Sequence, residues 1–307
     1  MADITAARIN NLQSSISLIL GTGSGQNGYG QTVSSLPVNN TDDIVTAEDI
    51  NLIYADILKA RVHQVGVTDI GIAEVIQNLN TVAEDTSTFV DNNGVTSLDP
   101  DGFKKGLADF ETVMSAVQSD KAIMHPSQAA LEPGISSARS SSWNGLIYHE
   151  VAVTFSSADA RRFFFNTGGE LRISANNTGA TTPKGLDWNQ LCSQVGTIKF
   201  SSESTISTTG SGSSIGNYDL TSAFQNIYQK IGSGTYSAVY AGNIYTVKAR
   251  SDIDTRIIFR IEFNDVVFDN NVDNNVDGRL ESTIQHYRAN GGVTVSPPSY
   301  YNTHTLS

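Results

Sequence analysis

Apolar residues recur with a helical period in the first half of the chain. Over residues 4–20 they are spaced three or four positions apart, which predicts an amphipathic helix ending at Gly21. Similar stripes predict three more helices, over residues 46–63, 68–82 and 100–117. Pro100 stands at the start of the last one, where its fixed φ suits a first helical turn.

The second half changes to the two-residue alternation of half-buried strands. Residues 150–155 and 255–263 alternate most regularly. The Gly pair within residues 163–175 predicts a hairpin, because glycine supplies the positive φ of a tight turn. Further strands are expected over residues 197–200, 236–249, 283–288 and 293–295. Two short helices are expected over residues 187–195 and 220–231.

The change of period predicts an α+β protein with two regions. Residues 1–140 form a helical assembly or attachment region. It contains a Gly-rich loop at 21–40 and closes with a hinge of small residues at 127–142. Residues 141–307 form a β-rich domain. Several strands separated by short turn signals favour a mainly antiparallel, sandwich-like arrangement over a parallel sheet.

Charge excludes some partner classes. Lys and Arg number 19 and Asp and Glu number 31, a formal net charge of −12. Residues 1–140 carry 7 basic and 17 acidic residues, so most of the excess acidity lies there. We expect neither a nucleic-acid partner nor a polybasic membrane-surface role, since both need a basic face. Charged residues make up only 16 % of the chain, and Ser, Thr, Asn and Gly supply much of the remaining polarity, as suits β-structure and turns.

The single cysteine and the N-terminal residues indicate the cellular compartment in which the protein is made. Cys192 is the single cysteine, so no intramolecular disulfide can form, and its residue type suggests a small core residue. The first residues lack the basic and apolar regions of a secretory signal. The apolar stretch at residues 16–20 is too short to span a bilayer. We therefore expect a soluble protein made in a cytoplasm.

Two glycine motifs imitate catalytic or cofactor sites. Residues 23–28 match G-x-G-x-x-G, but a dinucleotide site needs a strand before the motif and a helix directly after it. Residues 212–216 match G-x-S-x-G, but they lie in a Ser/Gly-rich segment without the strand-to-helix turn of a nucleophile elbow. We predict neither a cofactor-binding nor a catalytic residue, and hence no enzyme.

Metal sites are also not predicted. Cys192 has no cysteine partner, and no two histidines have the spacing of a helical zinc pair among His63, His125, His149, His286 and His304. Within and directly after residues 269–277, Asp273, Asn275, Asp277 and Gly278 imitate the opening of a calcium loop, but Ile284 stands at the twelfth position, where such a loop needs Glu. A solvated loop is the main interpretation, and weak calcium binding is the alternative.

The densest aromatic cluster is Arg-Arg-Phe-Phe-Phe at residues 161–165. Alternation would place Phe163 and Phe165 on one face of a strand and Phe164 on the other. One interpretation is a core strand with arginine stems at its edge. The other is an interface with another subunit, where aromatic residues and Arg are enriched.

Several segments, in order, resemble virion structural proteins of tailed phages, especially contractile-tailed cyanophages. They include LILGTGSGQNGYGQTVSS, KARVHQVG, SSWNGLIYHEVAVTFSSADARRFFFNTGGELRISANNTG, TIKFSS, SGSSIGNYDLTSAFQNIYQK, IIFRIEFND and DGRLESTIQHYRANGGVTVSPPSY. The resemblance spans most of the chain and implies a non-enzymatic particle component, located in the virion. It provides no catalytic residues and no position on the particle.

The resemblance and the residues together lead to the following expectation. The chain is a structural protein of the tail, neck or baseplate region that assembles as a symmetric homo-oligomer with other virion proteins. The alternative is a fibre or appendage module that binds a receptor or host-surface glycan through its β-rich half. No cofactor is expected.

Overall fold

A computed structural model describes residues 6–38, 45–67, 89–90, 96–97, 107–266 and 275–306. The chain divides into two compact units, here called the helical unit and the β unit. The helical unit comprises residues 1–130, 162–168 and 289–295. The β unit comprises residues 131–161, 169–288 and 296–307. The helical unit thus takes up two short segments from the second half of the chain.

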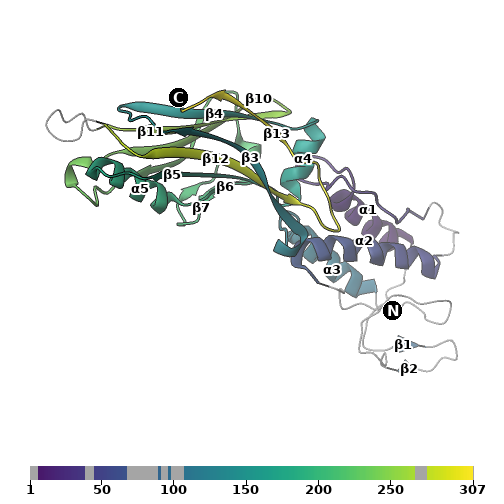
Figure 1. The fold of residues 1–307 in the computed structure, drawn as a ribbon. Coiled ribbons are helices and arrows are strands. Elements are labelled where there is room, and N and C mark those ends of the chain that lie inside the picture. Colours follow the sequence, from purple (N-terminus) through teal and green to yellow (C-terminus); the bar gives the residue numbers. More distant parts are fainter. Residues whose placement is uncertain are drawn as a thin grey trace. The chain divides into compact units, whose positions relative to one another are not determined.

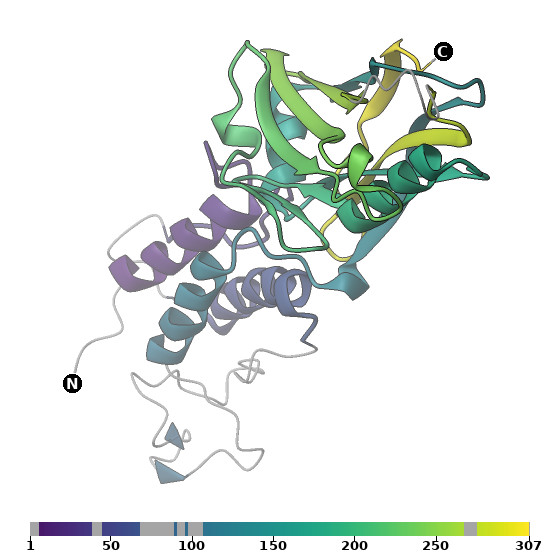
Figure 2. The same ribbon diagram turned by 90° about the vertical axis from the view of Figure 1, so that its left-hand side faces the viewer.

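Among its described residues, the helical unit contains the long helices α1 (Ala6–Leu20), α2 (Ala47–Val65) and α3 (Leu107–Ser119). Each contacts the other two, and Figure 2 shows them side by side, from purple to blue. Their buried apolar residues include Ile16, Ile57 and Phe110. The strands β1 (Phe89–Val90) and β2 (Thr96–Ser97) form a separate antiparallel pair. No helix among the described residues is both long and apolar enough to cross a membrane.

Local signals set the limits of α2. The Thr46 side chain accepts from the backbone N–H of Asp49, and the Asp49 carboxylate accepts from the backbone N–H of Thr46, which completes a capping box. Gly66 ends the helix in the left-handed conformation, with φ +71°. The helix expected over residues 46–63 is confirmed, and the one expected over 4–20 is confirmed from Ala6, where the described residues begin. The one expected over 100–117 is present from Leu107, and the one over 68–82 lies outside the described residues.

Two antiparallel sheets form the β unit (Figure 1). The five-stranded sheet has the order β13-β4-β11-β10-β9, and the six-stranded sheet has the order β3-β12-β5-β6-β7-β8. The five-stranded sheet consists of β13 (Ser299–His304), β4 (Leu146–Thr154), β11 (Arg256–Asn264), β10 (Ile244–Ile253) and β9 (Gln225–Ile231). The six-stranded sheet consists of β3 (Ala129–Arg139), β12 (Arg279–Ala289), β5 (Glu170–Thr178), β6 (Ile198–Phe200), β7 (Thr205–Ser207) and β8 (Gly212–Ser213).

The core of the β unit lies between these sheets. Alternate side chains of β11 point inward, and Phe259 contacts Phe200 of the other sheet with ring centroids 5.2 Å apart. The helix α5 (Pro183–Val195) contacts β5 of one sheet and β9 of the other. Its Trp188 is fully buried and packs against Phe263. The expected α+β class with a sandwich-like β region is therefore confirmed.

Several predicted elements were wrong. The expected hinge at 127–142 contains β3, which pairs with the distant strand β12, and the expected helix at 220–231 contains the strand β9, which pairs with β10. Within 163–175 the first part belongs to the helix α4 (Ala158–Asn166) and the second to β5, not to a hairpin. No strand forms over 293–295, whose Thr294 makes only an isolated bridge.

Other strands and helices matched their predictions. The strands over 150–155, 197–200, 255–263 and 283–288 correspond to β4, β6, β11 and β12. The helix expected over 187–195 corresponds to α5. The segment 236–249 begins as a short 3-10 helix (Ala238–Tyr240) and becomes β10 only at Ile244. The strand β13 was not predicted.

Candidate functional site

The Gly-rich loop is bound by the end of α4 that belongs to the helical unit. Arg162 donates to the carbonyl of Asn27 at 2.6 Å. The Asn166 amide donates to the carbonyls of Gly25, Asn27 and Gly28 at 3.2, 2.8 and 3.2 Å. The loop therefore turns carbonyl oxygens toward α4, whereas a phosphate-binding loop presents N–H groups to its ligand. Residues 21–38 of this loop are described, and residues 39 and 40 are not.

Two glycines of this loop have a packing explanation. Gly28 has φ +95°, and a Cβ there would lie 2.2 Å from the carbonyl oxygen of Thr22. Gly30 has φ +69°, and a Cβ there would lie 2.3 Å from the ring of Phe163. Both positions need glycine for backbone conformation and for space.

The G-x-S-x-G segment lies at an edge of the six-stranded sheet. Gly212 and Ser213 form β8, which pairs with β7, and the Ser213 hydroxyl donates to the carbonyl of Ile227 at 2.8 Å. Ser214 is exposed and is followed by a short 3-10 helix over residues 217–219. This geometry differs from a nucleophile elbow, in which a strand leads through a sharp turn into an α-helix.

Cys192 lies on α5 and is buried, as its residue type suggested. Burial raises the pKa of its thiol to about 12. A thiol with so high a pKa is not the nucleophilic thiolate at neutral pH.

Of the calcium-like segment, residues 269–274 lie outside the described residues. The carboxylate of Asp277 accepts from the hydroxyls of Thr181 and Thr182 at 2.7 and 2.6 Å, and from both of their backbone N–H groups. These residues lead into α5. Asp277 therefore orders the turn before that helix.

The histidines are dispersed. His63 is buried and its Nε2 lies 2.9 Å from the carbonyl oxygen of Thr167. His125 caps a short 3-10 helix, and His304 stacks on Tyr148. Within the described part of the chain, no group of three or more His, Cys, Asp and Glu side chains could hold a metal ion.

The Arg-Arg-Phe-Phe-Phe cluster is helical, so the expected strand alternation was wrong. Phe164 and Phe165 are both fully buried although they are adjacent in the sequence. Adjacent residues can share the wide buried stripe of a helix, whereas in a strand they point to opposite faces.

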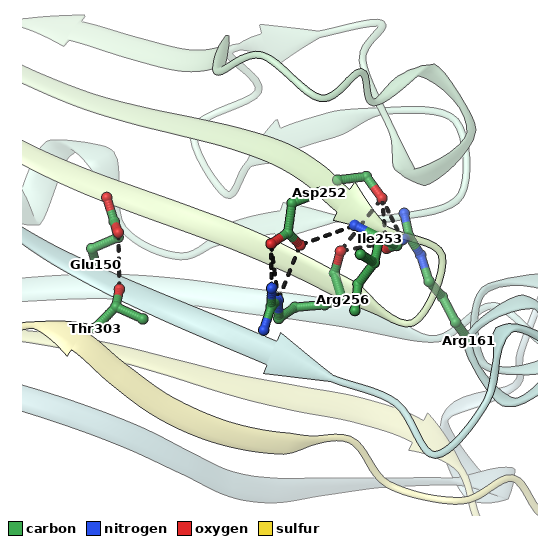
Figure 3. Close-up of polar contacts among 7 residues, drawn as sticks. Glu150, Arg161, Asp252, Ile253, Arg256 and Thr303 are labelled. Carbon is green, nitrogen blue, oxygen red and sulfur yellow. Dashed lines mark hydrogen bonds and ion pairs between the residues drawn. The ribbon is translucent and has the colours of Figure 1, made fainter.

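Arg161 holds the turn between β10 and β11. Its guanidinium donates to Asn217 Oδ1 and Ser251 Oγ, both at 2.7 Å. The same group donates to the carbonyl of Ile253 at 3.4 Å, and Figure 3 shows Arg161 beside Ile253. It also donates to the carbonyls of Asp254 and Arg256. Burial lowers its pKa to about 10, so the group remains charged at neutral pH.

The outer face of the five-stranded sheet carries charged and aromatic side chains. Here the name covers its outward side chains Tyr148, Glu150, Lys248, Arg250, Arg260, Glu262, Tyr301, Thr303 and His304. The Glu150 carboxylate accepts from Arg260 at 2.7 Å and from Thr303 at 2.9 Å (Figure 3 shows the second contact). Lys248 pairs with Glu262 at 2.9 Å. Charges on this face are thus matched across adjacent strands.

Aromatic rings complete the outer face. The rings of Tyr148 and His304 stack with centroids 4.0 Å apart. Arg260 lies over the rings of both Tyr148 and Phe224, at 4.9 and 4.4 Å. Tyr301, in contrast, is 70 % exposed. It is the aromatic side chain of this face that a partner could reach most fully.

A second polar network joins the two sheets. His286 on β12 lies between Glu132 of β3 and Tyr300 of β13, with Nε2 2.9 Å from Glu132 Oε2 and Nδ1 3.0 Å from the Tyr300 hydroxyl. Arg288 binds both oxygens of Glu132, at 2.9 and 2.6 Å. Hydrogen bonding to Arg288 lowers the pKa of Glu132, and burial lowers the pKa of His286.

His149 extends this network between the sheets. Its Nδ1 lies 3.1 Å from the Ser282 hydroxyl on β12, and its Nε2 lies 2.8 Å from Asn302 Oδ1 on β13. Burial lowers the pKa of His149 as well. Neither Arg161 nor Glu132 could be assigned such a role from the sequence, because their hydrogen-bond partners stand far away in the chain.

No protein-family model, curated protein or solved structure matches this chain.

Proposed function

We propose that the chain is a non-enzymatic structural protein of a tailed-phage virion, in the tail, neck or baseplate region. Two observations support this. One is the ordered set of segments that resemble such proteins. The other is the position of the polar side chains in those segments. His149, Arg161, Asn166 and His286 all contact groups of their own fold. Polar side chains that bind their own fold stabilise its structure, as expected of segments with a structural role.

Assembly as a symmetric homo-oligomer is part of the proposal. Virion parts repeat around an axis, so modest contacts per subunit add up over the ring. Sedimentation of the purified full-length chain over a range of concentrations should show a discrete oligomer. A strict monomer at high concentration that also makes no particle contacts would contradict the proposal.

The location has a direct test. Purified particles of the phage that encodes this chain should contain it at a fixed copy number, measured by quantitative mass spectrometry. A cryo-EM map of the same particles should place it in a symmetric layer. Its absence from washed particles, with the other structural proteins retained, would overturn the proposal.

A receptor- or glycan-binding module is the second candidate, favoured by the exposure of Tyr301 on the outer face. An exposed ring beside polar side chains is a surface on which a sugar ring can stack. A glycan array should then give binding that Tyr301→Ala removes and that Ile206→Ala preserves, since Ile206 is an exposed residue of the other sheet. An array without reproducible binding would eliminate this candidate.

A further inference from the structure

A lysine and an aspartate meet inside the β unit with no access to solvent. Lys184 Nζ lies 2.6 Å from Asp265 Oδ2, and the exposed fraction of both side chains is zero. Lys184 is in the first turn of α5, and Asp265 directly follows β11. The pair differs from Lys248 and Glu262 on the outer face, whose side chains are 35 % and 12 % exposed.

A structured loop covers the pair. Asp187, one turn along α5, accepts from the backbone N–H groups of Tyr236 and Ser237 at 2.9 and 3.2 Å. The loop continues to Tyr240, which is buried and whose ring centroid lies 5.9 Å from Lys184 Nζ. The backbone N–H of Val266 donates to the buried side chain of Asn243 at 3.3 Å.

Two charges in such a place are costly. Removing an ammonium and a carboxylate from water carries a penalty that their mutual attraction often fails to repay. A neutral amide made from the same two groups would remove both charges while keeping the side chains in place. Folding already holds the amine beside the carboxyl group. The reaction therefore does not incur the loss of translational and rotational entropy that opposes it between free molecules in solution.

We propose that Lys184 and Asp265 condense to an intramolecular isopeptide bond. A proton moves from the Lys184 ammonium to the Asp265 carboxylate, which leaves a neutral amine and a neutral acid. The lone pair of Nζ attacks Cγ of Asp265, and a C–N bond forms. A C–O bond of the tetrahedral intermediate then breaks, and the oxygen leaves as water with two protons from the former ammonium. No oxidant, reductant or cofactor is required.

The bond would join α5 to the end of β11. Closing a long loop covalently stabilises a fold by restricting the unfolded chain, as a disulfide does. This chain has one cysteine, so a disulfide within it cannot fulfil that role. The inference is independent of the proposed virion function.

Mass spectrometry tests the proposal on the full-length protein. After folding, the denatured wild-type chain should be lighter than its sequence mass by one water. A protease digest should contain one branched peptide that joins the segment with Lys184 to the segment with Asp265. Lys184→Met and Asp265→Ala should restore the sequence mass. Lys248→Met instead removes the partly exposed pair on the outer face, and should keep the loss of water.

Asp265→Asn gives a second, chemically distinct readout. An amide side chain that reacts with Lys184 releases ammonia, so this variant should lose the mass of ammonia in place of water. The proposal is overturned if mature wild-type protein has its full sequence mass and the two segments are recovered as separate peptides. It is equally overturned if a water is lost but tandem spectra place the loss at a succinimide, for example at Asp277–Gly278.

Discussion

The imidazole of His286 lies between the Tyr300 hydroxyl and the Glu132 carboxylate, which is 154 positions away in the chain. A carboxylate can only accept, so Nε2 of His286 carries the proton and donates it to Glu132. The other ring nitrogen, Nδ1, accepts a hydrogen bond from the Tyr300 hydroxyl. This tautomer needs a neutral ring, which agrees with the lowered pKa of His286. Three strands from two sheets are thereby connected by one side chain.

Glu132→Ala should destabilise the β unit by about 2 kcal/mol, because it leaves the largely buried Arg288 without its carboxylate partner. Urea unfolding followed by tryptophan fluorescence suits the measurement, since Trp143 and Trp188 both belong to the β unit. The matched control is Glu281→Ala, whose partner Arg279 is half exposed. The control should cost less than about 1 kcal/mol. Equal losses of unfolding free energy in the two variants would show that the Glu132 network stabilises the β unit no more than an exposed ion pair does.

Arg161→Met should cost about 3 kcal/mol, because the buried amide of Asn217 and the partly buried hydroxyl and carbonyl acceptors of the β10–β11 turn lose a charged donor. Arg161→Lys should recover only part of this, since an ammonium cannot reproduce the planar fork of donors. Denaturant midpoints of the three proteins provide the measurement. Wild-type stability in Arg161→Met would contradict the assigned role.

Gly30→Ala should destabilise the helical unit by about 3 kcal/mol, from left-handed backbone strain together with the clash against Phe163. Gly25 provides the control: its φ is +54°, but nothing lies within 4 Å of an added Cβ. Gly25→Ala should therefore cost only the backbone strain, about 1 kcal/mol. Urea unfolding followed by circular dichroism at a helical wavelength should separate the two. A larger loss for Gly25→Ala would refute the assigned packing of the loop on Phe163.

Stability should fall as the solution becomes acidic. Burial lowers the pKa of His63 from 6.5 to about 4. Below pH 6.5 the unfolded chain binds a proton at His63 that the folded chain accepts only near pH 4, so the free energy of unfolding rises with pH across this window. The loss on going from pH 6.5 to 4 should reach about 3 kcal/mol from this residue. His149 and His286, with pKa values also lowered by burial, act in the same direction.

Urea midpoints measured between pH 4 and 7.5 test this dependence. His63→Gln, which keeps a side-chain N–H donor for the carbonyl of Thr167, should reduce the slope without abolishing it. An unchanged slope would show that His63 does not contribute to the pH dependence of stability.

Local pattern was sufficient wherever an element's own residues decide its form. The capping box at Thr46 marks the start of α2, and the alternation over residues 255–263 marks β11. Local pattern failed where tertiary contacts determine the secondary structure of a segment. The segment at β9 was assigned to a helix, yet pairing with β10 makes it a strand. The phenylalanines at 163–165 were assigned to a strand, yet they belong to a helix.

The sequence by itself determined the α+β class, the change from helical to strand period along the chain, and the start of α2, because these depend on neighbouring residues. Only the tertiary structure decided that Glu132 meets His286, that Arg161 holds the β10–β11 turn, and that Lys184 meets Asp265. Their hydrogen bonds and ion pairs join residues brought together by strand order and sheet packing. That order depends on contacts summed over the whole core, which no local spacing of residues records.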